Sequence, residues 1–174
     1  MITFRSVRKA AFSPTVIYIL RCIIGFSAGY FLMLTFPRFD LFWALLSIVL
    51  VISPEGKDSK RLSMERVKAN LIGAFSGFLP IYLPLGTYYK VLAGITLAAI
   101  LCRLFNLLTV ARTAVVAIII ILIEKPNDGF MAPVDRFLSV LAGCLIGLLI
   151  TLITAYIIKF AYKRILLLEY KLLK

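Results

Sequence analysis

Long apolar stretches, broken by short polar segments, dominate this chain. The longest runs from Phe137 to about Ile158 and contains no charged residue. A stretch of about 20 apolar residues is long enough to cross the ~30 Å hydrocarbon core of a bilayer as an α-helix. Runs of this length are too long for the core helices of a soluble domain of this size. The pattern therefore predicts transmembrane helices.

The same pattern predicts six spans joined by short loops, in which proline, glycine, asparagine and aspartate supply the turns. The expected spans are residues 15–36, 41–53, 67–85, 88–108, 111–123 and 137–158. The second and fifth are too short to cross a membrane, because about 13 helical residues rise only about 20 Å. A basic, leucine-rich segment, residues 163–174, is expected to form a separate amphipathic helix at the membrane surface.

An internal repeat connects two parts of this pattern. The segment ERVKANLIGAFSG, residues 65–77, aligns without gaps with DRFLSVLAGCLIG, residues 135–147. An acid–arginine pair and two glycines coincide at a common offset of 70 residues. Because three helices separate the two copies, they are expected to cross the membrane in opposite directions. Inverted repeats of this kind are common in transporters, and short segments at corresponding places point to a substrate site.

The sequence therefore predicts an all-α integral membrane protein whose six transmembrane helices form an inverted repeat of three helices each. The six-helix domain is expected to cover residues 1–162, with repeat halves at about 15–85 and 86–158, followed by the basic tail at 163–174. Glycines four residues apart in both copies favour close approach of helices. These helix-packing glycines are Gly73, Gly77, Gly143 and Gly147.

Composition and charge agree with a membrane location. Apolar residues make up 62% of the 174 positions, charged residues 16%, and the net charge is +12. With the N-terminus inside, fifteen lysines and arginines lie on the inner side and four on the outer, with Arg21 set apart inside the first span. This bias predicts the cytoplasmic (inner) membrane, cytoplasmic termini and contact with anionic lipids. Without a basic soluble domain, nucleic acid is not expected as a partner.

The residues that usually carry catalysis or bind metal are missing. The chain has no histidine, and its three cysteines all lie inside apolar spans: Cys22, Cys102 and Cys144. They are interpreted as small buried apolar residues. Motifs of serine hydrolases, zinc proteases and nucleotide-binding loops are absent. We therefore expect no enzyme activity, no metal and no cofactor.

A family resemblance adds to this picture. The stretch FWALLSIVLVISPEGKDSKRLSMERVKANLIGAFSG resembles the hallmark of the fusaric acid resistance (FUSC) and aromatic acid exporter superfamily. In that hallmark a Trp-Ala helix ends in a proline, and an Arg-led helix of pattern R-x-x-G-T-x-x-G follows. The matching residues are Trp43-Ala44, Pro54, Arg66 and Gly73, whereas Ala69 and Asn70 replace the Gly-Thr pair.

The second copy extends the resemblance. DRFLSVLAGCLIGLL is similar to the sixth helix of that superfamily and of the related plant aluminium-activated malate transporters. In all, the likeness covers most of residues 15–158. It implies transport of small organic anions.

Four polar residues in or at the ends of the spans are candidates for substrate binding. They are Arg21, inside the first span, Arg103 and Asn106, near the inner end of the fourth, and Arg112, at the start of the fifth. Ionisable residues inside membrane spans are costly, rare and commonly functional. The planar guanidinium fork also suits a carboxylate. The alternative for Arg103 and Arg112 is that they extend to the inner membrane interface.

Two functions of different classes remain open. The first is a transporter or channel for small organic anions, with efflux of aromatic or other carboxylates implied by the resemblance. The second is a non-transporting scaffold or anchor subunit of a larger complex. Intramembrane arginines and paired short helices favour transport. Because six helices make a thin bundle and two-fold symmetry is the commonest closed assembly, a homodimer is expected.

Overall fold

A computed structural model describes residues 13–37, 41–124 and 131–172, and in these residues every regular element is helical. The expected all-helical architecture is confirmed. The α-helices are α2 (Pro14–Thr35), α3 (Phe42–Val51), α4 (Ser59–Ile81), α5 (Thr87–Leu104), α6 (Ala111–Ile119) and α7 (Met131–Leu172). A 3₁₀ turn, η1 (Leu108–Val110), precedes α6, and a π-helical turn, η2 (Ile120–Glu124), follows it.

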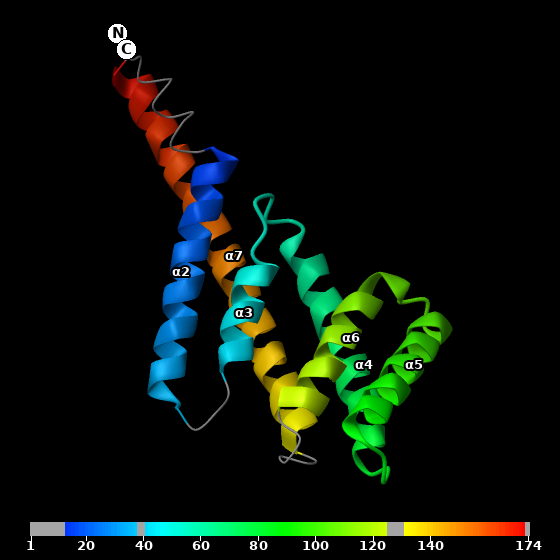
Figure 1. Ribbon diagram of the computed structural model, residues 1–174. Helices are drawn as coiled ribbons and strands as arrows, with labels where there is room; N and C mark the ends of the chain where they lie inside the picture. Colours follow the sequence, from blue (N-terminus) through cyan, green and yellow to red (C-terminus); the bar gives the residue numbers. More distant parts are fainter. Residues whose placement is uncertain (1–12, 38–40, 125–130, 173–174) are drawn as a thin grey trace.

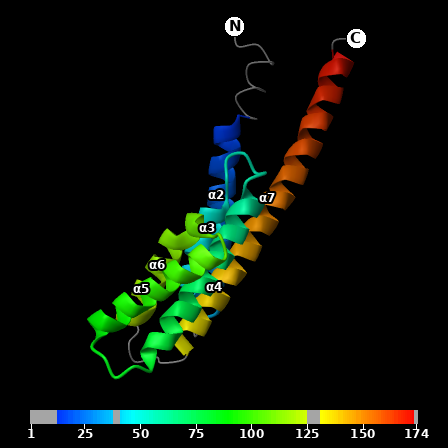
Figure 2. The same cartoon turned by 90° about the vertical axis from the view of Figure 1, so that its right-hand side faces the viewer.

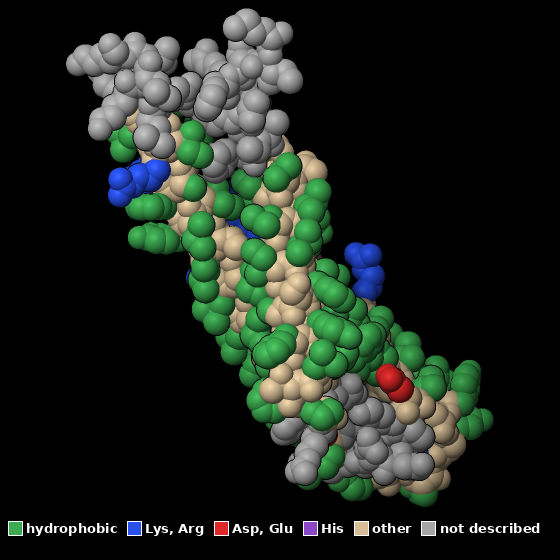
Figure 3. Space-filling view, turned by 90° about the vertical axis from the view of Figure 1, so that its left-hand side faces the viewer, with side chains coloured by type: hydrophobic (Ala, Val, Ile, Leu, Met, Phe, Trp, Pro, Cys, Tyr) green, Lys and Arg blue, Asp and Glu red, His purple; other side chains and the backbone are tan. Residues whose placement is uncertain are grey.

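Within the described residues, three helical segments are long and apolar enough to cross a membrane: Pro14–Thr35, Thr87–Leu104 and Pro133–Leu167. Helix α3 is apolar but short, and α4 begins with several charged residues. Large apolar side chains are exposed along most of these helices, and Figure 3 shows them covering most of the described surface on one face. Such an apolar exterior suits a hydrocarbon solvent, in which apolar surface need not be hidden.

The helices form two groups that meet along the contact between α4 and α7 (Figure 1). Helix α2 packs against α3 and α7, whereas α5 packs against α4 and α6. The two short helices each pack against a long helix of the other half of the chain: α3 against α7, and α6 against α4. Helix α2 begins and α7 ends at the same end of the molecule (Figure 1).

The start of α2 follows directly from its sequence. Ser13 lies just before the helix, and its hydroxyl accepts a hydrogen bond from the amide of Val16 at 3.3 Å. Pro14 occupies the first helical position, where its missing N–H costs nothing. The predicted span, residues 15–36, matches this helix to within a residue at each end.

Helix α4 begins at Ser59, eight residues before the predicted start of its span at residue 67. Its first two turns are polar, so hydropathy alone omits them, although side-chain pairs support the helix there. Arg61 lies 3.0 Å from Glu65 and 3.8 Å from Asp58, which are neighbours on a helical surface. The helix ends at Ile81, just after Pro80 and short of the predicted residue 85.

Helix α5 ends at Leu104 because Asn106 takes a left-handed backbone conformation with φ of 54°. The amide of Leu107 donates to the carbonyl of Cys102 at 2.7 Å, and that of Asn106 donates to the carbonyl of Arg103 at 3.3 Å. This pair of bonds forms a Schellman motif, and asparagine tolerates the left-handed position better than most residues. The predicted span of residues 88–108 therefore ends early.

The prediction of a separate basic helix at 163–174 is wrong. Helix α7 is one continuous helix of 42 residues that includes the sixth span and the described part of the basic segment. Its length, about 63 Å at 1.5 Å per residue, exceeds the hydrocarbon thickness about twofold. No glycine or proline follows Gly147, so nothing in the sequence interrupts the helix. In Figure 2, α7 extends well past the other helices.

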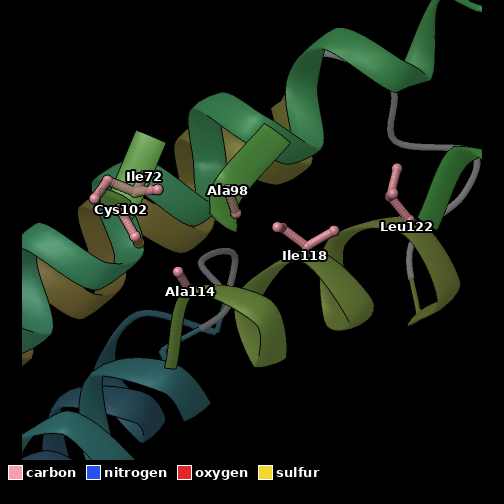
Figure 4. Packing of buried hydrophobic residues seen from close by; sticks show 6 residues of the cluster. All are labelled: Ile72, Ala98, Cys102, Ala114, Ile118 and Leu122. Carbon is pink, nitrogen blue, oxygen red and sulfur yellow. The ribbon is translucent and has the colours of Figure 1, made fainter. Parts of the chain in front are cut away.

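Two clusters of buried apolar residues hold the groups together. One joins α4, α5, α6 and η2 and consists of Ile72, Ala98, Cys102, Ala114, Ile118 and Leu122 (Figure 4). The other joins α3 to α7 and consists of Val51, Val140 and Cys144, with Trp43 and Val67 packed against it. Several of these side chains are small, which lets the helix backbones approach closely.

Candidate functional site

Arg21 lies between three parts of the chain and is only 5% exposed. Its Nε donates to the hydroxyl of Thr154 on α7 at 3.0 Å, and its Nη1 donates to the carbonyl of Ser53, just after α3, at 3.2 Å. Gly56 leaves room for this guanidinium, because a Cβ at that position would lie 2.9 Å from Nη1. Gly56 also has φ of 65°, which favours glycine. Both of these acceptors of Arg21 are neutral oxygens.

Arg66 enters the contact between α3 and α7 from α4. Its Nη2 donates to the hydroxyl of Ser47 at 3.2 Å, and its guanidinium also lies beside the thiol of Cys144. Its Nε is buried with no hydrogen-bond partner in the described part of the chain. A buried donor without a partner costs about 1–3 kcal/mol. An anion or a water molecule that accepted a hydrogen bond from this N–H would remove that cost.

Arg136, on the first turns of α7, is 8% exposed. Its guanidinium carbon lies 3.8 Å from the centre of the Trp43 ring at the start of α3. Cations are attracted to the face of an aromatic ring, and tryptophan is the best such partner. This contact keeps a positive charge at the end of the α3–α7 contact opposite to Arg21.

The three arginines form a row along the α3–α7 contact. Arg136 belongs to α7, Arg66 lies beside Cys144 of α7, and Arg21 lies beside Thr154 of α7. At 1.5 Å per residue, these three positions on α7 are separated by about 12 Å and about 15 Å. On the α3 side they reach Trp43, Ser47 and Ser53 in the same order. The contacts of the row thus cover about 27 Å along α7, but only about 15 Å along the ten residue steps from Trp43 to Ser53 on the α3 side.

The structure does not gather the four polar residues that the sequence suggests as a substrate site. Arg21 is buried on the α2–α3–α7 side, whereas Arg103, Asn106 and Arg112 are exposed around the turn between α5 and α6. Neither α5 nor α6 is among the helices that pack against α2. Asn106 also has a local structural role, since its left-handed backbone ends α5.

The sequence alone does not single out Arg66 and Arg136 as site residues: both mark the repeat and count in the charge bias, and Arg66 also matches the family hallmark. The repeat itself is the signal that could have identified them. Both arginines follow an acidic residue at the start of a matching copy, 70 residues apart. Each is a cation at the edge of an apolar segment, like Arg103 and Arg112.

An apolar groove lies elsewhere, between α4 and α7. Its volume is about 260 Å³, and its lining includes Phe75, Phe78 and Phe137 together with other apolar side chains. No charged residue lines it. It therefore offers no group that would recognise an anion, and the row of arginines is the stronger candidate site.

Comparison with known proteins identifies the family. A family model described as fusaric acid resistance protein-like matches residues 23–150, which is more than two thirds of the chain. No curated protein and no solved structure matches the chain. The family and the three apolar helices together indicate a membrane protein. The chain therefore belongs to the fusaric acid resistance protein-like family, whose members are transporters and not enzymes.

Proposed function

We propose that this chain is a transporter or channel for small organic anions and that it exports aromatic or other carboxylates. The observation that carries the proposal is the row of Arg21, Arg66 and Arg136 along the α3–α7 contact. Family membership supports the transport of organic acids in general. The row supplies the chemistry that an anion needs in an apolar surrounding.

Guanidinium groups suit this task for two reasons. Their planar fork matches the two oxygens of a carboxylate, and charge-assisted hydrogen bonds of this kind are about twice as strong as neutral ones. The partners of Arg21 and Arg66 described above are hydroxyl, carbonyl and thiol groups, none of which carries a negative charge. A carboxylate could therefore bind successive arginines without first displacing an acidic side chain from Arg21 or Arg66.

Arg103, Asn106 and Arg112 have a separate place in the proposal. They are exposed where α5 turns into α6, so they could attract an anion before it enters the row. The positive charges of Arg103 and Arg112 would raise the local anion concentration at this turn. Within one chain they form no common site with Arg21.

The inverted repeat is part of the same proposal, and the packing of the glycines supports it. A Cβ on Gly73 of α4 would meet Ala114 and Ala117 of α6, and one on Gly143 of α7 would meet Ala44 and Ser47 of α3. These two sets of contacts are related residue by residue at the repeat offset of 70. The short helix of each half thus packs on the long helix of the other half in the same manner.

For topology we propose an inner-membrane protein with both ends of the chain in the cytoplasm, supported by the lysine and arginine bias. A single cysteine at Asp58→Cys, in a variant whose three native cysteines are replaced by alanine, should react with a membrane-impermeant maleimide only from the cytoplasmic side. Asp58 lies in the α3–α4 loop, beside the exposed pair of Lys57 and Glu55. Labelling from the outside would reverse the topology.

A homodimer completes the proposal. The six α-helices in the described part of the chain, two of them short, make a thin bundle, and two-fold symmetry is the commonest closed assembly. The mass of the protein in lipid nanodiscs, measured by light scattering, should correspond to two chains. A particle containing one chain that transports at full rate would remove the dimer.

The deciding experiment for the function is a flux assay in proteoliposomes with a panel of aromatic and aliphatic carboxylates. We expect at least one carboxylate to cross faster than in protein-free vesicles, and cations of similar size to show no such increase. Folded protein that moves no member of the panel would contradict anion transport. That result would favour the second candidate from the sequence, a membrane scaffold or anchor.

A further inference from the structure

A crevice opens between the first turns of α2 and the distal part of α7. Its volume is about 360 Å³, and it is lined by Ile17, Arg21, Ala155, Ile158, Lys159 and Tyr162. Unlike the apolar groove between α4 and α7, it contains two positive charges. These charges come from helices that lie far apart in the sequence and pack side by side.

We propose that this crevice binds the phosphate of an anionic phospholipid. The position of Lys159 along α7, at the end of the apolar run, favours a lipid headgroup as the ligand. Lys159 is exposed and is the first charged residue after the apolar run of residues 137–158. The end of such a run coincides with the end of the hydrocarbon core, where lipid phosphates lie. Basic pockets between membrane helices commonly hold anionic headgroups.

Arg21 contributes a second, fixed cation. It has five N–H donors, and its hydrogen bonds to Thr154 and Ser53 hold the guanidinium in place. The side chain still lines the crevice. A cation that is already ordered loses little conformational entropy when an anion binds. Together Arg21 and Lys159 can hold one phosphate from two sides.

The surface below the two cations suits an acyl chain. Ile24 lies one turn deeper than Arg21 on α2, and Leu152 lies two turns deeper than Lys159 on α7; the two residues are 39% and 58% exposed. Both are apolar, so they continue the crevice toward the middle of the membrane as an apolar strip. A soluble anion would gain nothing from contact with such an apolar strip, whereas the acyl tail of a phospholipid would cover it. This difference favours lipid over a free phosphate or carboxylate.

The proposal can be tested on the purified full-length protein by native mass spectrometry with phosphatidylglycerol and phosphatidylcholine. We expect tighter binding of phosphatidylglycerol, and Lys159→Gln should weaken that binding about fivefold to tenfold, since a lysine near an anionic surface contributes about 1 kcal/mol. Lys163→Gln is the matched control. It removes the same charge one turn further along α7, from an exposed residue that does not line the crevice.

Three results would overturn the proposal. Equal binding of the two lipids would remove the preference for an anionic headgroup. Equal losses in Lys159→Gln and Lys163→Gln would show that only the general charge of α7 matters. Displacement of phosphatidylglycerol by soluble glycerol phosphate at comparable concentration would assign the crevice to a free anion. None of these measurements depends on flux, so the lipid site and the transport proposal can fail separately.

Discussion

Gly143→Ala is expected to lower the free energy of unfolding by about 1–3 kcal/mol, as overpacking of a close contact does. A Cβ at this position would collide with the carbonyl oxygen of Ala44 and lie 2.8 Å from its Cα. These are backbone atoms of α3, so no side-chain rotation can relieve the contact. Helices α3 and α7 would have to move apart. Thermal denaturation in detergent, followed by the fluorescence of Trp43, measures the effect.

Gly77→Ala is the matched control. It lies on α4 at the position that the repeat pairs with Gly147, but its nearest neighbours are side-chain atoms of Ile121 at 3.5 Å or more. That distance is an ordinary van der Waals contact, so we expect no loss of stability and a gain of up to about 1 kcal/mol, because alanine favours a helix over glycine. Gly73→Ala should resemble Gly143→Ala, because its Cβ would lie 2.6 Å from Ala117. Equal stability of Gly143→Ala and Gly77→Ala would contradict close backbone packing at Gly143.

The second large effect concerns transport. Arg66→Gln should reduce carboxylate flux at least tenfold, because hydrogen bonds to a charged group contribute about 1.5–3 kcal/mol each. Glutamine can still donate to Ser47, so the contact with α3 is kept. Stability should fall little, or rise, because burying a neutral side chain costs less than burying a cation. Flux and denaturation midpoint are measured on the same preparation, and Arg66→Lys should restore part of the flux.

Arg61→Gln is the control for that experiment. Arg61 lies on the same helix, is exposed, and pairs with Asp58 and Glu65 in solvent. Exposed ion pairs contribute little to stability, so neither flux nor stability should change. Unaltered flux in Arg66→Gln would take the arginine row out of the transport proposal. A loss of flux that tracks a loss of folded protein would make Arg66 a structural residue only.

Much of the fold could be predicted because long apolar runs indicate membrane helices, and prolines and glycines indicate the turns between them. The boundaries were less accurate, for a physical reason. Hydropathy reports where the hydrocarbon ends, whereas a helix ends where its backbone hydrogen bonds end. Helix α4 therefore begins at Ser59, before the apolar stretch, and α7 continues through Lys159 and Lys163 without a break.

The arginine row could not be predicted in the same way. Its members come from α2, α4 and α7, and their partners lie up to 133 residues away in the sequence. Exposure at Arg103 and burial at Arg21 depend on which helices pack together, and a single sequence does not reveal this. The sequence shows only the offset of 70 residues between Arg66 and Arg136, which indicates duplication and does not by itself indicate a shared site.

Because α7 is one continuous helix, a small tilt near its middle would move its far end by a larger distance. Gly143 and Gly147 press α7 against the backbone of α3, and from Gly147 to Leu172 the helix continues for 25 residues, or about 37 Å. If the glycine contact acts as a fulcrum, a tilt of about 10° there would displace the far end by about 6 Å, given that length. Any rearrangement at the α3–α7 contact would thus be enlarged at the end of the chain, where another molecule could sense it or restrain it.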